Sequence, residues 1–323
     1  MTILFAKKIM GAKISRMVKK RIHALFHRAA PKMRFPACFI FNDFQSSKMA
    51  ARPCAAHRLA KNWVFHQPVR THIASALLAL LAVACATGTA ADNPPERYGY
   101  RVISEYAHDP QAFTQGLVYY RGFLYESTGR YGASSIRKVE METGKVVAQR
   151  ALPARFFGEG LTVAGDRLIQ LTWREATGFV YDPESLELLA TFHYPTEGWG
   201  LAYDGAWLLM SDGSATLYRL DPETFGIVGT LEVRDAGVPV RRLNELEFIE
   251  GSLYANVWQE ERIAKIDPAS GRVIAWIELG GLLGKRAPGA GVLNGIAFDH
   301  ASRRLLVTGK LWPKLFVIDI VVN

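Results

Sequence analysis

Cysteine is scarce in this 323-residue chain, and none follows Cys85. The region after that point can therefore form neither an internal disulfide nor a thiolate metal site. Histidine is also sparse there, and His108, His193 and His300 are too scattered for a zinc site of ordinary spacing. The fold of this region must be stabilised by packing.

The chain also lacks an apolar run that would span a bilayer comfortably. The run at 73–86 falls short of the roughly 20 residues that a transmembrane helix needs. It follows Arg70 and ends in small residues, which is typical of a secretory signal with cleavage between Ala84 and Asp92. We therefore expect export, periplasmic or secreted, with no membrane span in the mature form. Lipoprotein anchoring through Cys85 is the less favoured alternative.

Acidic residues are nearly absent from the first part of the chain. Residues 1–72 hold 15 of the 39 Lys and Arg residues but only one of the 30 acids, Asp43. The remaining 24 basic and 29 acidic residues give the rest a net charge of −5. The basic pI is thus no evidence for nucleic-acid binding. We divide the chain into a basic extension at 1–72, disordered or upstream of the true start, a signal region at 73–92 and a folded domain at 93–323.

Five segments of the folded domain align as internal repeats. Each is a short apolar run, a turn usually marked by glycine and a second apolar run, which predicts a β-hairpin. The segments are QGLVYYRGFLYEST from Gln115, EGLTVAGDRLIQLT from Glu159, WGLAYDGAWLLMSD from Trp199, NELEFIEGSLYANV from Asn244 and NGIAFDHASRRLLVT from Asn294. Their starts are 44, 40, 45 and 50 residues apart, the length of a propeller blade.

A third strand and a turn follow four of the hairpins, and a fourth strand comes after the turn. Asp-Pro dipeptides mark three of these turns, at Asp182, Asp221 and Asp267, because proline fixes φ and aspartate bonds nearby amides. The pattern predicts an all-β, five-bladed propeller of four-stranded antiparallel blades. The last blade ends one strand short, and residues 98–106 can supply that strand. This pairing would close the ring and remove two exposed sheet edges.

The repeat register places ten residues around one opening of the central channel, because the innermost strands line a propeller's axis. These rim positions are the first residue of each repeat and the residue five places after the leucine of its second strand. The first set is Gln115, Glu159, Trp199, Asn244 and Asn294, and the second is Gly129, Trp173, Gly213, Trp258 and Lys310. Apolar walls with a few polar groups are typical of a small-ligand pocket.

Each rim residue also has an ordinary structural interpretation. A glutamate at a strand start is usually solvated, but Glu159 lies between two glycines and follows Phe156 and Phe157, surroundings that would desolvate it and raise its pKa. Tryptophans in β-repeats usually pack between blades, and we expect this of Trp207, Trp276 and Trp312. Trp173, Trp199 and Trp258 differ because they share a register that faces the opening.

The phrases HDPQAFTQGL, YESTGRYGASSIRKV, FGEGLT, LTW, LNELE, ANVWQ and VLNGIAFD are specific in combination. With them the chain resembles the glutamine cyclotransferases of the plant and bacterial propeller type, from about residue 102 to 319. The resemblance implies conversion of the N-terminal glutamine of a peptide or protein to pyroglutamate with release of ammonia, without a metal or organic cofactor. The site residues it implies are Phe113, Gln115, Phe157, Glu159, Trp173, Trp199, Asn244, Trp258 and Lys310.

In this interpretation the α-amine of the substrate attacks its own γ-carbonyl, and Glu159 carries the proton. We expect Asn244 and Gln115 to donate hydrogen bonds to the oxyanion, with Lys310 supplying positive charge. The five aromatic residues would hold the glutaminyl stem.

Two other functions stay open from the residues. One is a calcium-dependent lactonase-like hydrolase, for which Glu159, Asn244 and Asn294 are plausible oxygen ligands. The resemblance to that family would imply six blades, whereas five repeats are found here. The other is a propeller that binds peptides without catalysis, since a fold alone does not determine function.

Overall fold

The computed structural model describes residues 94–284 and 288–322, and none of these residues is in a helix. The predicted extension at 1–72, the signal region at 73–92 and all three cysteines lie outside the described residues. Among the described residues there is accordingly no helix of the length and hydropathy that a membrane span requires.

Three sheets follow one another along the chain, and each is a four-stranded antiparallel meander. The first consists of β2 (Thr114–Tyr120), β3 (Phe123–Thr128), β4 (Ser135–Val139) and β5 (Val146–Ala151). The second consists of β6 (Gly158–Ala164), β7 (Arg167–Thr172), β8 (Thr177–Tyr181) and β9 (Leu188–His193). The third consists of β10 (Leu201–Tyr203), β11 (Leu208–Ser211), β12 (Thr216–Leu220) and β13 (Ile227–Glu232). The prediction of four-stranded antiparallel units is confirmed here.

The last two repeats share one eight-stranded sheet, in the order β16-β17-β18-β19-β1-β22-β21-β20. Its strands are β16 (Leu243–Ile249), β17 (Ser252–Val257), β18 (Arg262–Ile266), β19 (Val273–Glu278), β20 (Leu293–Asp299), β21 (Arg304–Gly309), β22 (Lys314–Val322) and β1 (Glu96–Ala107). The N-terminal strand β1 pairs antiparallel with β22, as expected. The start of β1 also pairs in parallel with residues 275–277 of β19; this pairing joins the two units and was not predicted.

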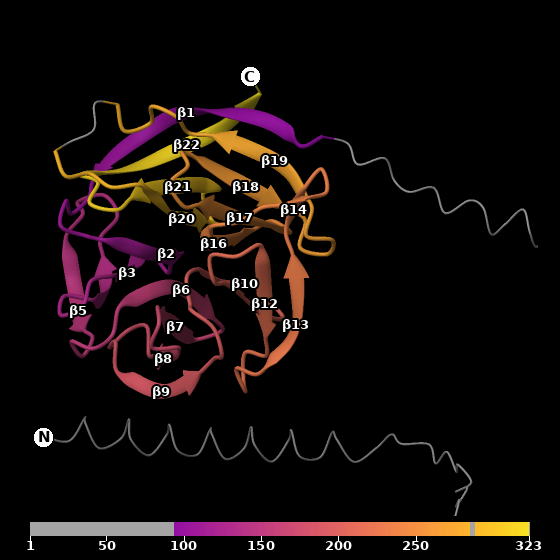
Figure 1. Cartoon of the computed structure of the whole chain (residues 1–323). Helices are drawn as coiled ribbons and strands as arrows, with labels where there is room; N and C mark the ends of the chain where they lie inside the picture. The colour runs from indigo at the N-terminus through magenta and orange to yellow at the C-terminus, as the bar shows by residue number, and fades with distance from the viewer. Residues whose placement is uncertain (1–93, 285–287, 323) are drawn as a thin grey trace, which may run out of the picture. The chain divides into compact units, whose positions relative to one another are not determined.

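The first strands of the five repeats, β2, β6, β10, β16 and β20, form a closed circle. Each contacts the next in this order, and β20 contacts β2 (Figure 1). β2, β6, β16 and β20 are mostly buried, whereas the fourth strands β5, β9 and β13 are mostly exposed. The repeat starts therefore gather at the centre of the circle. A short hairpin of β14 (Arg234–Asp235) and β15 (Val238–Pro239), not predicted from the repeats, precedes β16.

Glycine lets these inner strands approach one another closely. The second residue of four of the five repeats is glycine. A Cβ atom on Gly200 would lie 1.9 Å from the carbonyl oxygen of Asn244, and one on Gly160 would lie 2.6 Å from the amide nitrogen of Leu201. Any larger residue would force neighbouring sheets apart. The exception is Glu245, whose buried carboxylate accepts hydrogen bonds from the amides of Leu117 at 3.3 Å and Ile296 at 2.8 Å.

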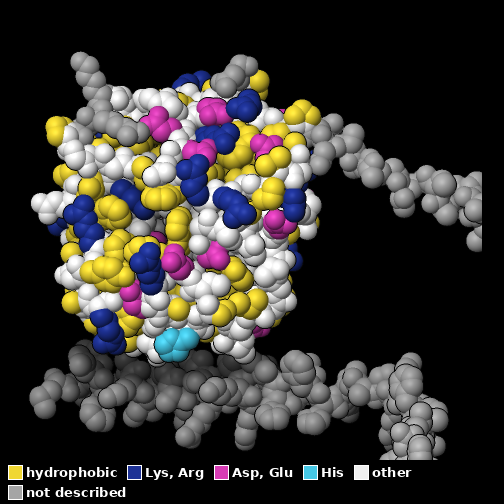
Figure 2. Space-filling view, in the orientation of Figure 1, with side chains coloured by type: hydrophobic (Ala, Val, Ile, Leu, Met, Phe, Trp, Pro, Cys, Tyr) yellow, Lys and Arg dark blue, Asp and Glu magenta, His cyan; other side chains and the backbone are white. Residues whose placement is uncertain are grey.

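The turns and the tryptophans can be compared with their predicted roles. Asp182 accepts hydrogen bonds from the amides of Glu184 and Ser185, and Asp221 accepts them from the two equivalent amides of its own turn. Asp267 accepts from the amide of Ala269 and from the hydroxyl of Ser270. Trp276 and Trp312 are buried as expected. Trp207 is 37% exposed at the β10–β11 turn, so the packing prediction was wrong there. On the face shown in Figure 2, basic and acidic side chains are interspersed with apolar ones.

Candidate active site

β-Bulges at the starts of four inner strands turn the first repeat residues out of the regular ladder. The pairing of β2 with β3 skips Gln115, since Thr114 pairs with Thr128 and Gly116 with Ser127. The same shift passes over Glu159 in β6, Asn244 in β16 and Asn294 in β20. A bulge leaves a residue unpaired and redirects its side chain. The repeat register therefore aims these side chains at the centre.

The second set of rim positions lies beside the first through repeated backbone bonds. The amides of Gly129, Trp173, Trp258 and Lys310 each donate to the carbonyl of the residue two places before a repeat start. Two of these acceptors are Phe113 and Phe157. This spacing explains how phenylalanines outside the ten rim positions reach the same opening.

A cavity of about 380 Å³ occupies this opening. Its lining consists of Phe113, Gln115, Phe157, Glu159, Trp173, Arg174, Glu197, Trp199, Asn244, Trp258 and Lys310. The structure thus brings all nine predicted site residues together and adds Arg174 and Glu197. The volume is within the range of small-molecule sites, roughly 300 to 1,000 Å³.

The other three rim positions shape the cavity from behind. Asn294 is fully buried, and its Nδ2 donates to the carbonyl of Thr114 at 3.0 Å and to Gln115 Oε1 at 3.3 Å. It does not line the cavity beside Glu159 and Asn244, as a shared calcium site there would require. Gly129 and Gly213 make room for rings, because a Cβ on either would lie within 3 Å of Phe157 or Trp199.

The floor of the cavity is polar and buried. Gln115 and Glu159 are each 4% exposed, Asn244 is 2% and Lys310 is 6% exposed. Gln115 Nε2 donates to Glu159 Oε1 at 2.8 Å, which fixes the carboxyl group. Asn244 Oδ1 is buried without a hydrogen-bond partner, an arrangement that a ligand N–H group would satisfy.

Aromatic rings form the walls and contact one another edge to face. The centroids of Phe113 and Phe157 are 6.1 Å apart, and Phe157 lies 5.6 Å from Trp173. Trp199 and Trp258 form the opposite pair at 5.9 Å. Trp258 is the most open of these, at 37% exposure. The site is therefore a slot with aromatic walls, of which Trp258 is the most exposed.

Burial dominates the electrostatics of the floor. It raises the pKa of Glu159 well above its ordinary value; the charge of Lys310 opposes this shift, while Glu197 and Glu175 add to it. Burial lowers the pKa of Lys310, and Glu159 opposes that shift. Both pKa shifts favour the neutral forms of the side chains, the protonated carboxyl group of Glu159 and the unprotonated amine of Lys310. Transfer of a proton from an ammonium group to a carboxylate therefore costs less free energy here than in water.

Glu197 and Arg174 were missed by the sequence analysis. Glu197 Oε2 accepts hydrogen bonds from the indole Nε1 atoms of both Trp173, at 2.7 Å, and Trp199, at 3.0 Å. Arg174 lies 3.9 Å above the Trp173 ring and donates to Glu197 Oε1 at 3.3 Å. Glu197 is in the loop between β9 and β10, at the same distance before its repeat start as Phe113 and Phe157. Its distance of two residues before Trp199 was the only signal available.

Histidine, cysteine and carboxylate side chains do not come together in a metal-binding group of three or more within 94–284 and 288–322. The floor of the candidate site consists of a carboxyl group, two amides and an amine, and its walls are aromatic. This set of groups can bind an aliphatic amine and amide and can move protons between them.

Comparisons with known proteins address the whole folded region. The family model described as glutamine cyclotransferase matches residues 75–320. The chain is 50% identical over 225 residues to an Arabidopsis thaliana protein named glutaminyl-peptide cyclotransferase, covering 68% of this chain and 70% of the relative. It is similar to the crystal structure of Myxococcus xanthus glutaminyl cyclase, with a TM-score of 0.67 and 39% identity over 71% of this chain and 99% of that one.

Proposed function

The chain belongs to the glutamine cyclotransferase family, and from this premise we propose how its cavity converts N-terminal glutamine to pyroglutamate. The resemblance found in the sequence is thereby confirmed. The enzyme is a glutaminyl-peptide cyclotransferase: the α-amine of the substrate replaces the γ-amide nitrogen, and ammonia is released. The residue roles below belong to the proposal.

The proposal includes the propeller itself. Five inner strands in a closed circle, with β1 added beside β22, support five blades that surround one axis. Export also belongs to the proposal and is supported by the signal-like run at 73–86, which lies outside the described residues.

The observation that carries the mechanism is the buried carboxyl group of Glu159 at the floor of an aromatic slot. Attack requires an unprotonated amine, whereas ammonia must leave with an added proton. A carboxyl group whose pKa is raised holds a proton more readily, so it can accept the first proton and return it to the leaving nitrogen. Glu159 is this group in our proposal.

The proton balance is closed within the site. The substrate ammonium gives one proton to Glu159, and the free amine nitrogen then bonds to the γ-carbon. Glu159 then gives this proton to the amide nitrogen of the tetrahedral intermediate and takes one from the attacking nitrogen. The bond between the γ-carbon and the amide nitrogen breaks, leaving the ring amide and ammonia. Ammonia takes the remaining proton from Glu159 and leaves as ammonium, which restores the carboxylate.

The amides of the floor take different roles. Gln115 already donates to Glu159, so its main role is to orient the carboxyl group toward the reacting nitrogen. Asn244 Oδ1 lacks a partner, so we assign it to a substrate N–H. The Asn244 Nδ2 and Lys310 Nζ groups then remain as hydrogen-bond donors to the oxyanion on the γ-carbon, where preorganised donors are most effective.

The walls fold the glutaminyl side chain back on its own amine. Intramolecular attack needs the two reacting atoms about 3 to 3.5 Å apart, and a narrow apolar slot favours the folded conformer. Glu197 holds the indoles of Trp173 and Trp199 at fixed orientations from one carboxylate oxygen. The slot is therefore preorganised before the substrate enters.

The test is ammonia release from a Gln-initiated peptide by the purified, chelator-treated protein, with the N-acetylated peptide as a blank. We expect turnover of the free peptide only, and loss of most of it in Glu159→Gln. Glu187→Gln, an exposed glutamate on the turn before β9, is the matched control. Full activity in Glu159→Gln would contradict the proton role. Binding without turnover would instead indicate a peptide-binding propeller, and activity lost with chelator would favour the metal-dependent alternative.

A further inference from the structure

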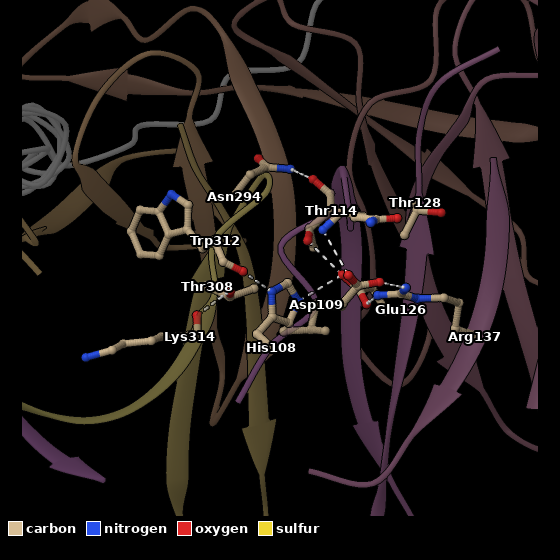
Figure 3. A network of polar contacts seen from close by, with 12 residues as sticks. His108, Asp109, Thr114, Glu126, Thr128, Arg137, Asn294, Thr308, Trp312 and Lys314 are labelled. Carbon is tan, nitrogen blue, oxygen red and sulfur yellow. Dashed lines mark hydrogen bonds and ion pairs between the residues drawn. The ribbon is translucent and has the colours of Figure 1, made fainter. Parts of the chain in front are cut away.

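A second cluster of buried charged groups lies next to the active site without lining it (Figure 3). His108, in the segment between β1 and β2, has a side chain only 7% exposed. Its Nδ1 lies 2.7 Å from the carbonyl oxygen of Trp312, and its Nε2 lies 3.1 Å from Glu126 Oε1 on β3. The imidazole thus bridges the first and the last repeat.

The geometry requires both ring nitrogens of His108 to carry protons. A carbonyl oxygen only accepts hydrogen bonds, and so does an ionised carboxylate. A neutral imidazole would direct one lone pair at one of these oxygens. Only the imidazolium form satisfies both contacts.

The groups that face His108 from neighbouring elements support this charge state. Glu126 also accepts from Thr114 Oγ1 at 2.7 Å and from Arg137 on β4, and Arg137 donates to Asp109 at 2.7 Å. Two carboxylates, one guanidinium and one imidazolium balance to zero, whereas neutral histidine would leave an excess negative charge. Burial would lower the pKa of His108, but the charge and hydrogen bond of Glu126 outweigh it and raise that pKa.

Both ends of the bridge are next to active-site residues. Trp312 belongs to the turn that carries Lys310, and Thr114 lies between Phe113 and Gln115. The amide of Leu311 donates to the carbonyl of Ala112 at 2.7 Å, which places the two segments side by side. A change in the bridge would shift Lys310 relative to Gln115.

We propose that His108, as a buried imidazolium, is a positioning residue that holds the Lys310 turn against the segment of Phe113 and Gln115. It does not touch the substrate. The proposal rests on the cyclotransferase function for its kinetic consequence alone, because the bridge itself is a property of the folded protein.

The direct test is an NMR titration of the wild-type protein with ¹⁵N-labelled histidine and backbone. At about pH 7, where an ordinary histidine is largely neutral, both ring nitrogens of His108 should show imidazolium shifts. When the ring finally loses its proton at higher pH, the amide signals of Lys310, Leu311 and Trp312 should move with the same midpoint. A neutral tautomer at about pH 7, or a turn that stays constant while the ring titrates, would overturn the proposal.

The kinetic test compares His108→Gln with His300→Gln, an exposed histidine that serves as the matched control. We expect kcat to fall roughly 10- to 100-fold in His108→Gln, the range for a small displacement of catalytic groups, with a smaller change in KM. The alkaline fall in kcat that follows His108 deprotonation should disappear in this variant. Unchanged kcat in a folded variant would refute the positioning role, and if the variant does not fold, the wild-type titration decides. Wild type without turnover would contradict the function and leave the titration valid.

Discussion

Two carboxyl groups, Glu159 and Glu126, are almost equally buried, with exposures of 4% and 2%, yet their pKa values move in opposite directions. Burial raises that of Glu159 well above normal, with only the charge of Lys310 opposing it. Burial would raise that of Glu126 as well, but His108 and Arg137 outweigh it and lower it to about 2. Partners, and not depth, decide whether a buried acid keeps its charge. The raised pKa of Glu159 favours the protonated acid, whereas the lowered pKa of Glu126 favours the carboxylate.

Of the substitutions considered, Glu159→Gln should have the largest effect, and it should lower activity without lowering stability. Loss of acid–base assistance typically lowers the rate about 10²- to 10⁴-fold. Stability should not fall with it, because glutamine removes a group that favours folding only while protonated. A raised pKa contributes stability below the ordinary value of 4.5, and that contribution is lost as the pH rises toward the folded pKa. Thermal unfolding should therefore show a Tm at least equal to wild type near neutral pH.

Glu126→Gln should show the reverse pattern. Removing one member of a buried ion network leaves His108 without its counter-charge and Arg137 with Asp109 alone, which costs about 3 to 5 kcal/mol of unfolding free energy. Urea denaturation would measure this loss, with Glu187→Gln as the control. A decrease no larger than that of the control would show that the network is dispensable and would remove the contrast with Glu159.

Glu197→Gln should have an intermediate effect on catalysis. The variant keeps one acceptor oxygen but loses the carboxylate that holds both Trp173 and Trp199. Hydrogen bonds to a charged group contribute roughly 1.5 to 3 kcal/mol, so we expect kcat/KM to fall about tenfold or somewhat more. Steady-state ammonia release measures it, and the smaller negative charge should also lower the pKa of Glu159. An unchanged kcat/KM would mean that the indoles hold their orientation without Glu197.

The pH dependence of stability should give the smallest effect. It should distinguish the network of Glu126 and His108 from the active-site carboxyl group of Glu159. The lowered pKa of Glu126 contributes stability above 4.5 that is lost as the pH falls toward about 2. The raised pKa of His108 contributes stability that is complete below 6.5 and lost as the pH rises through its folded value. The network should thus stabilise most between these limits. In His108→Gln the alkaline loss should be smaller than in wild type, as followed by urea denaturation.

The five internal repeats allowed much of the fold and of the candidate site to be predicted from the sequence. The repeat alignment predicted the hairpins, the pairing of β1 with β22 and the residues around the opening, because equivalent positions occupy equivalent places in the sheets. Features that occur once were missed. Glu197 and Arg174 are in loops, and β14 and β15 belong to an inserted hairpin. The parallel pairing of β1 with β19 joins two units, so neither repeat predicts it by itself.

The residue roles needed the three-dimensional contacts. Asn294 follows the same bulge pattern as Asn244, but it lies outside the cavity lining, and its Nδ2 donates inside the protein to Thr114 and Gln115. His108 has no repeat counterpart, and its contacts join β3 and the turn before β22 across the closure of the ring. Sequence spacing indicates which side chains face the centre, whereas their hydrogen-bond partners determine which remain available to a substrate.

The most direct test is a carboxyl titration by difference infrared spectroscopy, with wild type compared against Glu159→Gln and Glu126→Gln. The band assigned to Glu159 should remain that of a protonated acid well above the ordinary pKa of 4.5. The band assigned to Glu126 should remain that of a carboxylate until the pH approaches about 2. Ionisation of Glu159 at or below the ordinary glutamate pKa would contradict its role as the proton carrier.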